Sequence, residues 1–383
     1  MHFEFSTTGR IIFGNGTIKQ LPNYASSLGK NALVVCGKNS DRINPIVDSL
    51  NRAGIKTLVF SVSTEPTIPL ITNGIQRARS DNCNLVIGIG GGSVIDAGKI
   101  ISAMITNRGD LLEYLEVIGE GKNISHLPAP YIAIPTTAGT GAEVTCNAVL
   151  ASPEHKVKVS MRNSLMYPRI AMVDPELTYT MPPTITASTG LDALTQLLEA
   201  YVSNKANPLT DGICIEGLKR AGHSIYAAYK SGDKSAREEM CIASLFSGLA
   251  LANAKLGAVH GLAAPIGGMF SAPHGMICAR LLPFVFETNI NSLAKNDSSS
   301  NSLKQFDTAA QILTNNTNAS AMDAISWLKS ICTEMKIPAL KEFGIKENDI
   351  SVIVQQAKKS SSTKGNPIEL TDEELVRILQ QAM

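Results

Sequence analysis

LVIGIGGGSVIDAGK, residues 85–99, is the stretch that decides the fold. Its first residues are mostly apolar, which predicts a strand, and residues 94–99 predict the start of a helix. The glycines at 90–92 let backbone N–H groups approach a phosphate closely, and a helix N-terminus adds partial positive charge. The usual dinucleotide fingerprint would have its third glycine at Ser93, so a simple tight turn is the alternative interpretation.

Similar apolar runs flank this stretch. They lie at residues 32–36, 57–60, 131–134 and 170–173, with helical patterns between them. Runs that are apolar throughout predict parallel strands covered on both faces, and the alternation is typical of a doubly wound α/β domain. From residue 181 onward only helical patterns are found. We therefore expect an α/β nucleotide-binding domain at residues 1–180 and an all-α domain at residues 181–383.

A second loop supports the nucleotide interpretation. The segment PTTAGTGAE, residues 135–143, follows the next expected strand and is rich in hydroxyl groups and glycine. Turns that follow neighbouring parallel strands lie at the same edge of the sheet, where open α/β folds bind their ligands. Two such turns favour a bound nucleotide over two coincidental turns.

Composition excludes several classes of function. Lys and Arg number 34 against 33 Asp and Glu, a net charge of +1, so no basic surface favours nucleic acid. The seven cysteines are scattered and odd in number, which indicates reduced core residues of a cytosolic protein rather than disulfides or a zinc–thiolate site. The N-terminal segment lacks the apolar core of a signal peptide, and the apolar run at 241–254 is too short for a membrane span. We therefore expect a cytoplasmic protein without membrane partners.

Three polar side chains stand out in the second half because each has apolar neighbours. His260 and His274 lie in GAVHGLAAPIGGMFSAPHG, and Asp192 lies in TGLDALTQLLEAY. For either histidine alone, a core imidazole bonded to a backbone carbonyl is the simpler interpretation. One carboxylate with two imidazoles, however, is a common ligand set for a divalent transition metal with a position left open for substrate.

Five motifs together resemble the iron-containing (group III) alcohol dehydrogenase family, in that family's order. They are GGGSVIDAGK (90–99), PTTAGTGAEVT (135–145), VDPEL (173–177), TGLDALTQLLEAY (189–201) and GAVHGLAAPIGGMFSAPHG (257–275). The early segment RIIFGNGTIKQLP also looks like the family's N-terminal strand. The resemblance implies a dehydroquinate synthase-like fold, with a metal and a substrate in the cleft between an NAD(P)-binding α/β domain and a helical domain. It also implies a homodimer that transfers hydride between NAD(P) and a small alcohol, aldehyde or ketone.

The resemblance also implies which residues bind the cofactor. The family positions around the pyrophosphate correspond to Gly91, Gly92, Ser93, Asp96, Thr136, Thr137 and Thr140. Lys158 matches a family lysine near the ribose. For Lys158 an ordinary solvated surface lysine is the alternative.

The family's metal ligands are an Asp, a His four residues later and two further histidines. Asp192, His260 and His274 match three of them, and the resemblance gives them the catalytic role as well. Gln196 stands where the fourth ligand is usually His, and an amide oxygen binds a transition metal more weakly than an imidazole. Ala264 stands where many members carry a His close to the nicotinamide. Three states follow: a three-ligand site such as the Zn²⁺ site of related glycerol dehydrogenases, weak Fe²⁺ binding, or a metal-free site as in the maleylacetate reductases.

Two functions outside this class are less compatible with the sequence. A dehydroquinate synthase-like cyclase shares the fold, but it must grip a carboxylate and a phosphate, and only Lys255 and Arg280 lie near the metal motifs. A non-catalytic binding protein is disfavoured because the glycine and threonine loops are intact.

The loop after the first long apolar run bears on the choice between NAD and NADP. Many NAD-dependent members have an Asp directly after this strand, which bonds the ribose 2′-hydroxyl and repels a 2′-phosphate. Here Gly37, Lys38, Asn39 and Ser40 follow instead. Gly37 leaves room for a phosphate, Lys38 offsets its charge, and Asn39 and Ser40 can donate hydrogen bonds, so NADP(H) or dual use is favoured over NAD(H). The alternative is a plain loop in which Asp41 reaches back and keeps the preference for NAD.

Overall fold

The computed structural model describes residues 2–38, 40–155 and 157–383. The chain divides into two compact units. The α/β unit contains Thr7–Thr137 and Gly141–Thr180, and the helical unit contains Met1–Ser6, Ala138–Thr140 and Met181–Met383.

A parallel sheet of six strands is the centre of the α/β unit, in the order β1-β8-β5-β4-β2-β3. Its strands are β1 (Ile11–Phe13), β2 (Asn31–Cys36), β3 (Lys56–Ser61), β4 (Leu85–Gly90), β5 (Tyr131–Pro135) and β8 (Ile170–Val173). Each of the five apolar runs expected to be strands is one. The predicted doubly wound α/β fold is confirmed.

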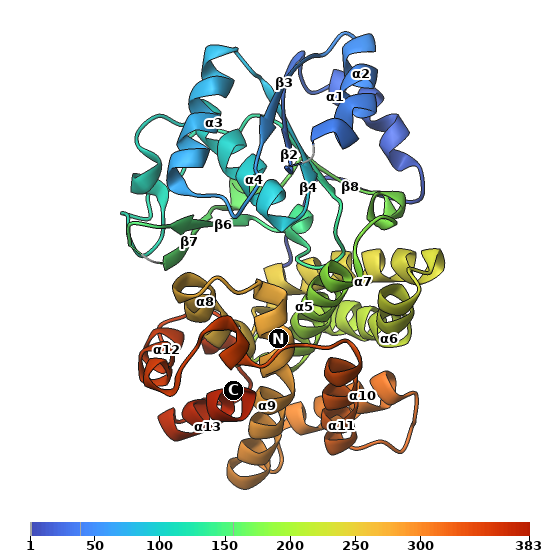
Figure 1. Cartoon of the computed structure of the whole chain (residues 1–383), viewed down its shortest axis with the longest axis vertical. Helices are drawn as coiled ribbons and strands as arrows, with labels where there is room; N and C mark the ends of the chain where they lie inside the picture. Colours follow the sequence, from blue (N-terminus) through green and yellow to red (C-terminus); the bar gives the residue numbers. More distant parts are fainter. Residues whose placement is uncertain (1, 39, 156) are drawn as a thin grey trace. The chain divides into compact units, whose positions relative to one another are not determined.

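Helices cover both faces of this sheet (Figure 1). They are α1 (Leu21–Ser26), α2 (Asn44–Arg52), α3 (Ile68–Ser80) and α4 (Gly92–Thr106). One core cluster contains Val34 of β2 and Leu50 of α2, and the other contains the neighbouring Leu33 of β2 and Ile71 of α3. Alternate side chains of one strand thus enter opposite cores, which is why the strands read as continuously apolar.

Glycine allows α4 to lie close to the sheet. A Cβ atom at Gly88 or Gly98 would lie 2.2 or 2.7 Å from the hydroxyl oxygen of Tyr131. That hydroxyl donates a hydrogen bond to the carbonyl oxygen of Ile95 at 2.9 Å. The contact fixes the N-terminus of α4 directly after the carboxyl end of β4.

A two-stranded antiparallel hairpin, β6 (Asn147–Ser152) and β7 (Val157–Arg162), was missed by the sequence analysis. In β7 the apolar residues alternate with Lys158, Ser160 and Arg162, a period of two that predicts a half-buried strand. In β6 the alternation is weak because a half-exposed Val149 stands among the polar positions. A parallel bridge between Thr67 and Ala151 places the hairpin beside the segment that follows β3.

The regular structure described in the helical unit consists of helices, as expected from residue 181 onward. The α-helices are α5 (Pro183–Val202), α6 (Pro208–Lys230), α7 (Lys234–Ala254), α8 (Ala258–Met269), α9 (His274–Asn296), α10 (Asn301–Thr314), α11 (Ala321–Glu334), α12 (Ile350–Ala357) and α13 (Asp372–Ala382). Helix α5 is buried almost continuously from Thr186 to Val202 and packs against α6, α7 and α9 (Figure 1). Its buried position explains why its sequence is apolar on nearly every face.

A sharp bend of 100° separates α7 from α8. Lys255 takes a left-handed φ of 63° there, and a Cβ atom at Gly257 would lie 2.8 Å from Glu199 Oε1. The bend therefore brings the start of α8 against α5. By length and composition, no single helix among the described residues qualifies as a membrane span, and only α7 and α8 taken together do so.

Candidate metal centre and nucleotide loop

Three helices bring together the three residues predicted as metal ligands. Asp192 lies on α5, His260 on α8 and His274 at the start of α9, and we call them the Asp–His–His cluster. Asp192 Oδ1 lies 3.5 Å from His260 Nε2 and 3.9 Å from His274 Nε2. The two imidazole rings are 5.4 Å apart between centroids and tilted by 57°. Asp192 and the two histidines, which lie more than 60 positions later in the sequence, thus converge in one place.

Glu199 orients His260. It lies seven residues after Asp192 on α5, on the same helix face. His260 Nδ1 and Glu199 Oε2 are 2.6 Å apart, and Glu199 also accepts hydrogen bonds from the backbone N–H groups of Val259 and His260. With its Nδ1–H donated to Glu199, the imidazole keeps the lone pair of Nε2 for the cluster, the arrangement typical of metal-binding histidines. The sequence analysis missed Glu199, although its spacing from Asp192 was visible.

The buried polar atoms of the cluster test whether a cation fits. Asp192 Oδ1 and His260 Nε2 are buried without a hydrogen-bond partner. An orphaned buried carboxylate oxygen is costly, whereas a cation between the two atoms would satisfy both. The donor set, one carboxylate oxygen and two imidazole nitrogens, is also one that divalent transition metals prefer.

Gln196 does reach the cluster, one helical turn after Asp192. Its Nε2 donates to Asp192 Oδ2 at 3.2 Å, and its Oε1 accepts a hydrogen bond from Ser247 Oγ at 3.0 Å. The opposite amide orientation would set two acceptor oxygens against each other at Asp192. The amide oxygen therefore faces away from the cluster, and Gln196 supports Asp192 instead of adding a ligand atom.

Cys278 is a neighbour that the sequence analysis did not foresee. It lies on α9 one turn after His274, and its Sγ is 3.6 Å from His274 Nε2. One ligand atom from each of Asp192, His260, His274 and Cys278 lies within 4.8 Å of the others. All seven cysteines are free and six of them are buried, as expected for reduced core residues, and Cys278 is one of the buried six. The spacing of four from His274 was the available signal.

The electrostatics of these four residues follow a consistent pattern. Burial lowers the pKa of His260, but Cys278, Asp192 and Glu199 raise it well above the ordinary value. Burial likewise opposes the charge of His274, whose pKa is raised by Cys278 and Asp192. For Asp192 and Cys278, burial raises the pKa, but the two histidines lower it below the ordinary value. Two acids with lowered pKa values thus face two histidines with raised pKa values, so each kind of group stabilises the charge of the other.

The start of α9 lies against α5 at Gly275. A Cβ atom at this position would lie 2.1 Å from the carbonyl oxygen of Ser188. Only glycine allows this approach, which holds His274 beside Asp192.

The predicted phosphate loop has the expected geometry. Helix α4 begins at Gly92, and its first intrahelical bonds are donated by Val94 and Ile95 to the carbonyl of Gly91. The N–H groups of Gly92 and Ser93 therefore precede the hydrogen-bonded turns, the position from which N–H groups can bind an anion at a helix start.

The second loop lies beside the first. Gly90 pairs with Pro135 in the sheet, and the backbone N–H of Thr136 donates to the Gly90 carbonyl at 2.9 Å. A Cβ atom at Gly91 would be 3.5 Å from Thr137 Oγ1. The structure thus brings Gly91, Gly92, Ser93 and Thr137 together with Thr136. Thr140 belongs to the helical unit.

Asp96 and Lys158 both contact protein groups. Asp96 Oδ2 accepts the backbone N–H of Val149 at 3.0 Å, and burial raises its pKa to about 6. Lys158 Nζ lies 2.5 Å from Glu65 Oε1. This ion pair lies beside the segment that follows β3. Lys158 is therefore at the carboxyl edge of the sheet, the edge expected for the cofactor.

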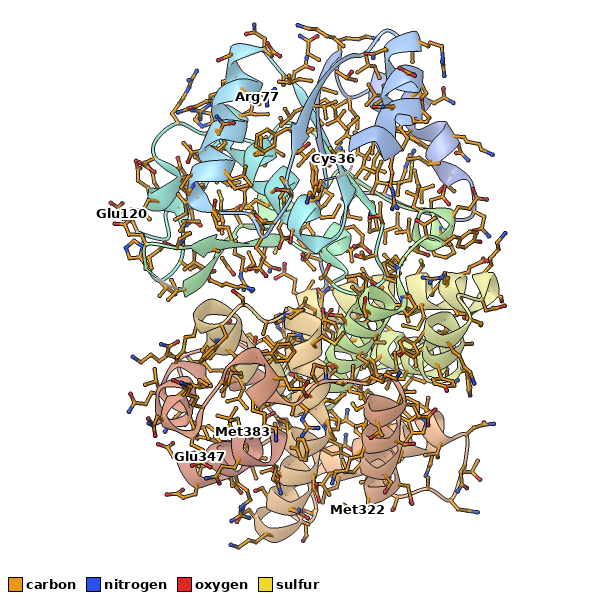
Figure 2. All side chains as sticks on the ribbon, in the orientation of Figure 1. Cys36, Arg77, Glu120, Met322, Glu347 and Met383 are labelled. Atoms are coloured by element: carbon orange, nitrogen blue, oxygen red, sulfur yellow. The ribbon has the colours of Figure 1, made fainter. Side chains whose placement is uncertain are left out.

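Gly37 and Lys38 follow Cys36, the last residue of β2, which is labelled in Figure 2. Lys38 is exposed, and a Cβ atom at Gly37 would meet no other atom within 4 Å. Asn39 lies outside the described residues, and Ser40 begins a 3₁₀ turn, η2 (Ser40–Ile43). The strand end predicted to face the ribose thus has open space at Gly37.

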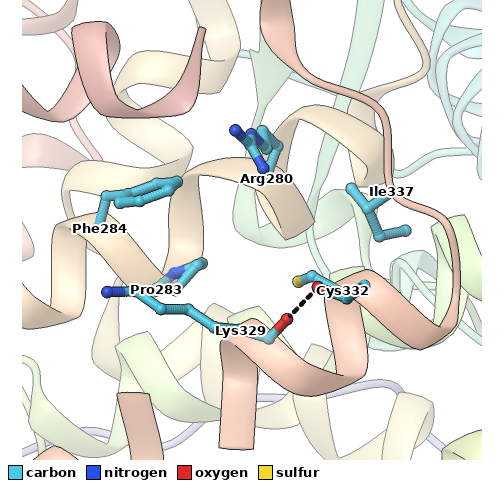
Figure 3. Close-up of a pocket in the computed structure, with 7 residues that line it drawn as sticks. Arg280, Pro283, Phe284, Lys329, Cys332 and Ile337 are labelled. Carbon is cyan, nitrogen blue, oxygen red and sulfur yellow. Dashed lines mark hydrogen bonds between the residues drawn. The ribbon is translucent and has the colours of Figure 1, made fainter. Parts of the chain in front are cut away.

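A separate pocket of about 230 Å³ lies on α9 and α11 (Figure 3). Arg280, Phe284 and Lys329 are among its lining residues. Both cations already have partners, because Arg280 Nε donates to the carbonyl of Ala382 and Lys329 Nζ pairs with Glu287. The pocket therefore lacks the free cations that a cyclase would need for a phosphorylated substrate.

Comparison with known proteins agrees with this geometry. The model of "Iron-containing alcohol dehydrogenase" matches residues 8–175, and that of "Fe-containing alcohol dehydrogenase family, C-terminal" matches residues 186–383. Alcohol dehydrogenase 4 of Saccharomyces cerevisiae (strain YJM789) is 34% identical over 378 residues, covering 97% of this chain and 96% of the yeast protein. The NADPH-dependent butanol dehydrogenase of Clostridium saccharobutylicum is 33% identical, covering 98% and 97%. The crystal structure of a 1,3-propanediol oxidoreductase superposes with a TM-score of 0.93 at 31% identity, covering 100% of both chains.

A doubly wound α/β unit with a glycine-rich loop at a strand end, combined with a helical unit whose Asp–His–His cluster could hold a metal ion, is an arrangement typical of nucleotide-dependent enzymes. The chain belongs to the iron-containing alcohol dehydrogenase family. Its activity is therefore that of an NAD(P)-dependent oxidoreductase acting on CH–OH groups, as the resemblance implied.

Proposed function

We propose that this protein is a metal-dependent alcohol dehydrogenase in which Asp192, His260 and His274 hold one divalent ion, Fe²⁺ or Zn²⁺. Its substrate is a small alcohol in one direction and an aldehyde or ketone in the other. The observation that carries the proposal is the pair of buried, unpartnered atoms, Asp192 Oδ1 and His260 Nε2, which point at one another across 3.5 Å.

The residues in and around the cluster have different roles. Asp192 supplies a buried negative charge, and Gln196 holds that carboxylate through its second oxygen. Glu199 fixes the His260 ring. The side chain of His274 is 37% exposed and so forms the open side of the cluster, where a substrate oxygen can approach. Asp192, His260 and His274 would hold the ion, which would provide Lewis acidity to that oxygen, and a bound nicotinamide would provide the hydride chemistry.

A metal-free reductase is the alternative that the sequence left open. In that state Asp192 Oδ1 and His260 Nε2 have no hydrogen-bond partner at normal distance, and only protons on the two imidazoles would offset the buried charge of Asp192. The orientation of His260 by Glu199 also has no purpose without a ligand for Nε2. Both observations favour the metal-dependent enzyme.

The cofactor we propose is NADP(H), or both nicotinamide cofactors. Support comes from Gly37, which places no carboxylate where a ribose 2′-phosphate would lie, and from the exposed Lys38 beside it. The related butanol dehydrogenase named above is NADPH-dependent.

We further propose a cytoplasmic homodimer. Seven free cysteines support a reducing compartment. Sedimentation of the purified chain tests the oligomeric state.

Metal analysis combined with a substrate screen tests the proposed function. We expect wild-type protein to retain a single equivalent of a divalent ion and to turn over small alcohols with NADH or NADPH. His274→Ala should lose the ion, because two ligands rarely hold it against water. His223→Ala, an exposed histidine of α6, is the matched control and should retain it. Protein that is metal-free and fully active, both as isolated and after reconstitution, would overturn the proposal.

A further inference from the structure

We propose that the Cys278 thiolate is the fourth protein ligand of the ion and takes the place left open at residue 196. This inference deepens the proposed function and rests on the Asp–His–His cluster. It assigns a residue of this chain that lies on α9, whereas the expected fourth ligand would lie on α5.

Gln196 is not free to bind an ion, because its amide already makes two side-chain hydrogen bonds. Both ends of its amide are hydrogen-bonded, to Asp192 Oδ2 and to Ser247 Oγ. For its oxygen to reach an ion, the amide would have to rotate and break both bonds. The α5 side of the cluster thus contributes one ligand, Asp192.

The distances between the four candidate ligand atoms are close to those found around one ion. An ion with bonds of about 2.0–2.3 Å, four protein ligands and a fifth position open to substrate separates neighbouring ligand atoms by roughly 2.8–4.0 Å. The measured separations are 3.5 Å from Asp192 to His260, 3.9 Å from Asp192 to His274, and 3.6 Å from His274 to Cys278. All four ligand atoms lie within 4.8 Å of one another. Small side-chain rotations therefore suffice to place them around one ion.

The charges of the four candidate ligands also fit a divalent ion. A carboxylate and a thiolate together neutralise a divalent ion, and both side chains are buried. A thiolate is a softer ligand than the imidazole it replaces, so the set Asp–His–His–Cys favours Zn²⁺ over Fe²⁺. The chain should therefore bind Zn²⁺ more tightly than Fe²⁺ despite the name of its family.

Cobalt substitution of the full-length protein tests the assignment directly. Co²⁺ bound by a thiolate gives a near-ultraviolet sulfur-to-cobalt charge-transfer band, and we expect this band in the wild type. It should disappear in Cys278→Ser and Cys278→Ala. Cys214→Ser, a buried cysteine of α6, is the matched control and should keep it.

Affinity measurements separate ligation from packing. By chelator competition, we expect Cys278→Ala to weaken Zn²⁺ binding by more than about 100-fold, beyond the 10–100-fold typical of outer-shell changes. Adding Gln196→His to that variant should restore most of the affinity, because an imidazole then enters from α5. The circular dichroism and Tm of the metal-free variants show whether they fold.

The outcomes distinguish the two proposals. If wild-type protein binds Zn²⁺ but shows no charge-transfer band with Co²⁺, and Cys278→Ala binds Zn²⁺ normally, Cys278 is not a ligand while the proposed function stands. If the wild type binds none of Zn²⁺, Co²⁺ and Fe²⁺, the proposed function fails as well.

Discussion

Glu199 acts on the cluster only through His260, which makes it a positioning residue. Glu199→Gln keeps the shape of the side chain but removes the charge that holds His260 Nδ1 at 2.6 Å. We expect metal affinity to fall by about 10–100-fold. Chelator competition measures the loss, and Glu216→Gln, which alters an exposed ion pair of α6, should leave affinity unchanged. Equal affinities for Glu199→Gln and wild type would show that His260 is oriented by other contacts.

Gly37 offers a test of cofactor choice with no expected cost to the fold, since a Cβ atom there would meet nothing within 4 Å. Gly37→Asp introduces a carboxylate that repels a 2′-phosphate and accepts hydrogen bonds from a 2′-hydroxyl, so kcat/KM should shift toward NADH. Gly37→Asn has the same size without the charge and should shift it much less. A strong NADH preference in the wild type that Gly37→Asp does not change would contradict the proposal.

Residue identity explains what the sequence could and could not reveal at the site. Asp192, His260 and His274 were identifiable because polar groups in apolar segments need partners. Glu199 and Cys278 were not, because their importance depends on which turn of α5 or α9 faces the cluster. Helical spacing narrows that choice, but only the packing of α5 against α8 and α9 decides it.

At the scale of elements, the close contact between α5 and α9 positions His274. Gly275→Ala would place a methyl group 2.1 Å from the Ser188 carbonyl oxygen, so the start of α9 must move. We expect a loss of about 1–3 kcal/mol in the free energy of unfolding and weaker metal binding. Denaturant unfolding measures the first and chelator competition the second.

Gly212→Ala is the control for that substitution. Gly212 lies inside α6, where a Cβ atom would meet nothing within 4 Å, so alanine should stabilise the helix by roughly 0.5–1 kcal/mol. If both variants behave alike, the α5–α9 contact does not constrain His274.

The strands differ in how well their sequences predicted them. Those of the main sheet are buried on both faces, so their runs are apolar throughout and easily recognised. The hairpin β6–β7 is half-exposed, and β6 alternates weakly, so its strands were missed. Burial on two faces leaves a clearer pattern than burial on one.

For the whole molecule, buried acids predict an unusual dependence of stability on pH. Glu143 is 2% exposed, and burial raises its pKa to about 7 despite the nearby Lys99. Between about pH 4 and pH 7 the folded chain therefore binds more protons at Glu143 than the unfolded chain, so the free energy of unfolding falls as the pH rises.

Glu143→Gln removes the fall in the free energy of unfolding that the ionisation of Glu143 causes. The variant should be more stable than the wild type by on the order of 3 kcal/mol at about pH 8, and by less than about 1 kcal/mol at about pH 5. Unfolding in denaturant across this range checks it, with the exposed Glu154→Gln as control. Parallel pH profiles for wild type and Glu143→Gln would show that Glu143 is not responsible.

The chain passes between the α/β unit and the helical unit at four peptide bonds: Ser6–Thr7, Thr137–Ala138, Thr140–Gly141 and Thr180–Met181. Even the three-residue segment Ala138–Thr140 is built into its unit, since Gly139 accepts a hydrogen bond from Ser247 and has no room for a side chain beside Thr189. The segments of the two units therefore alternate along the chain, so neither unit is one continuous stretch of sequence. A hybrid enzyme that combines one unit with the other unit of a relative would need compatible junctions at all four crossings. Dividing the gene at residue 180 would separate the main part of the helical unit from two of its segments, Met1–Ser6 and Ala138–Thr140.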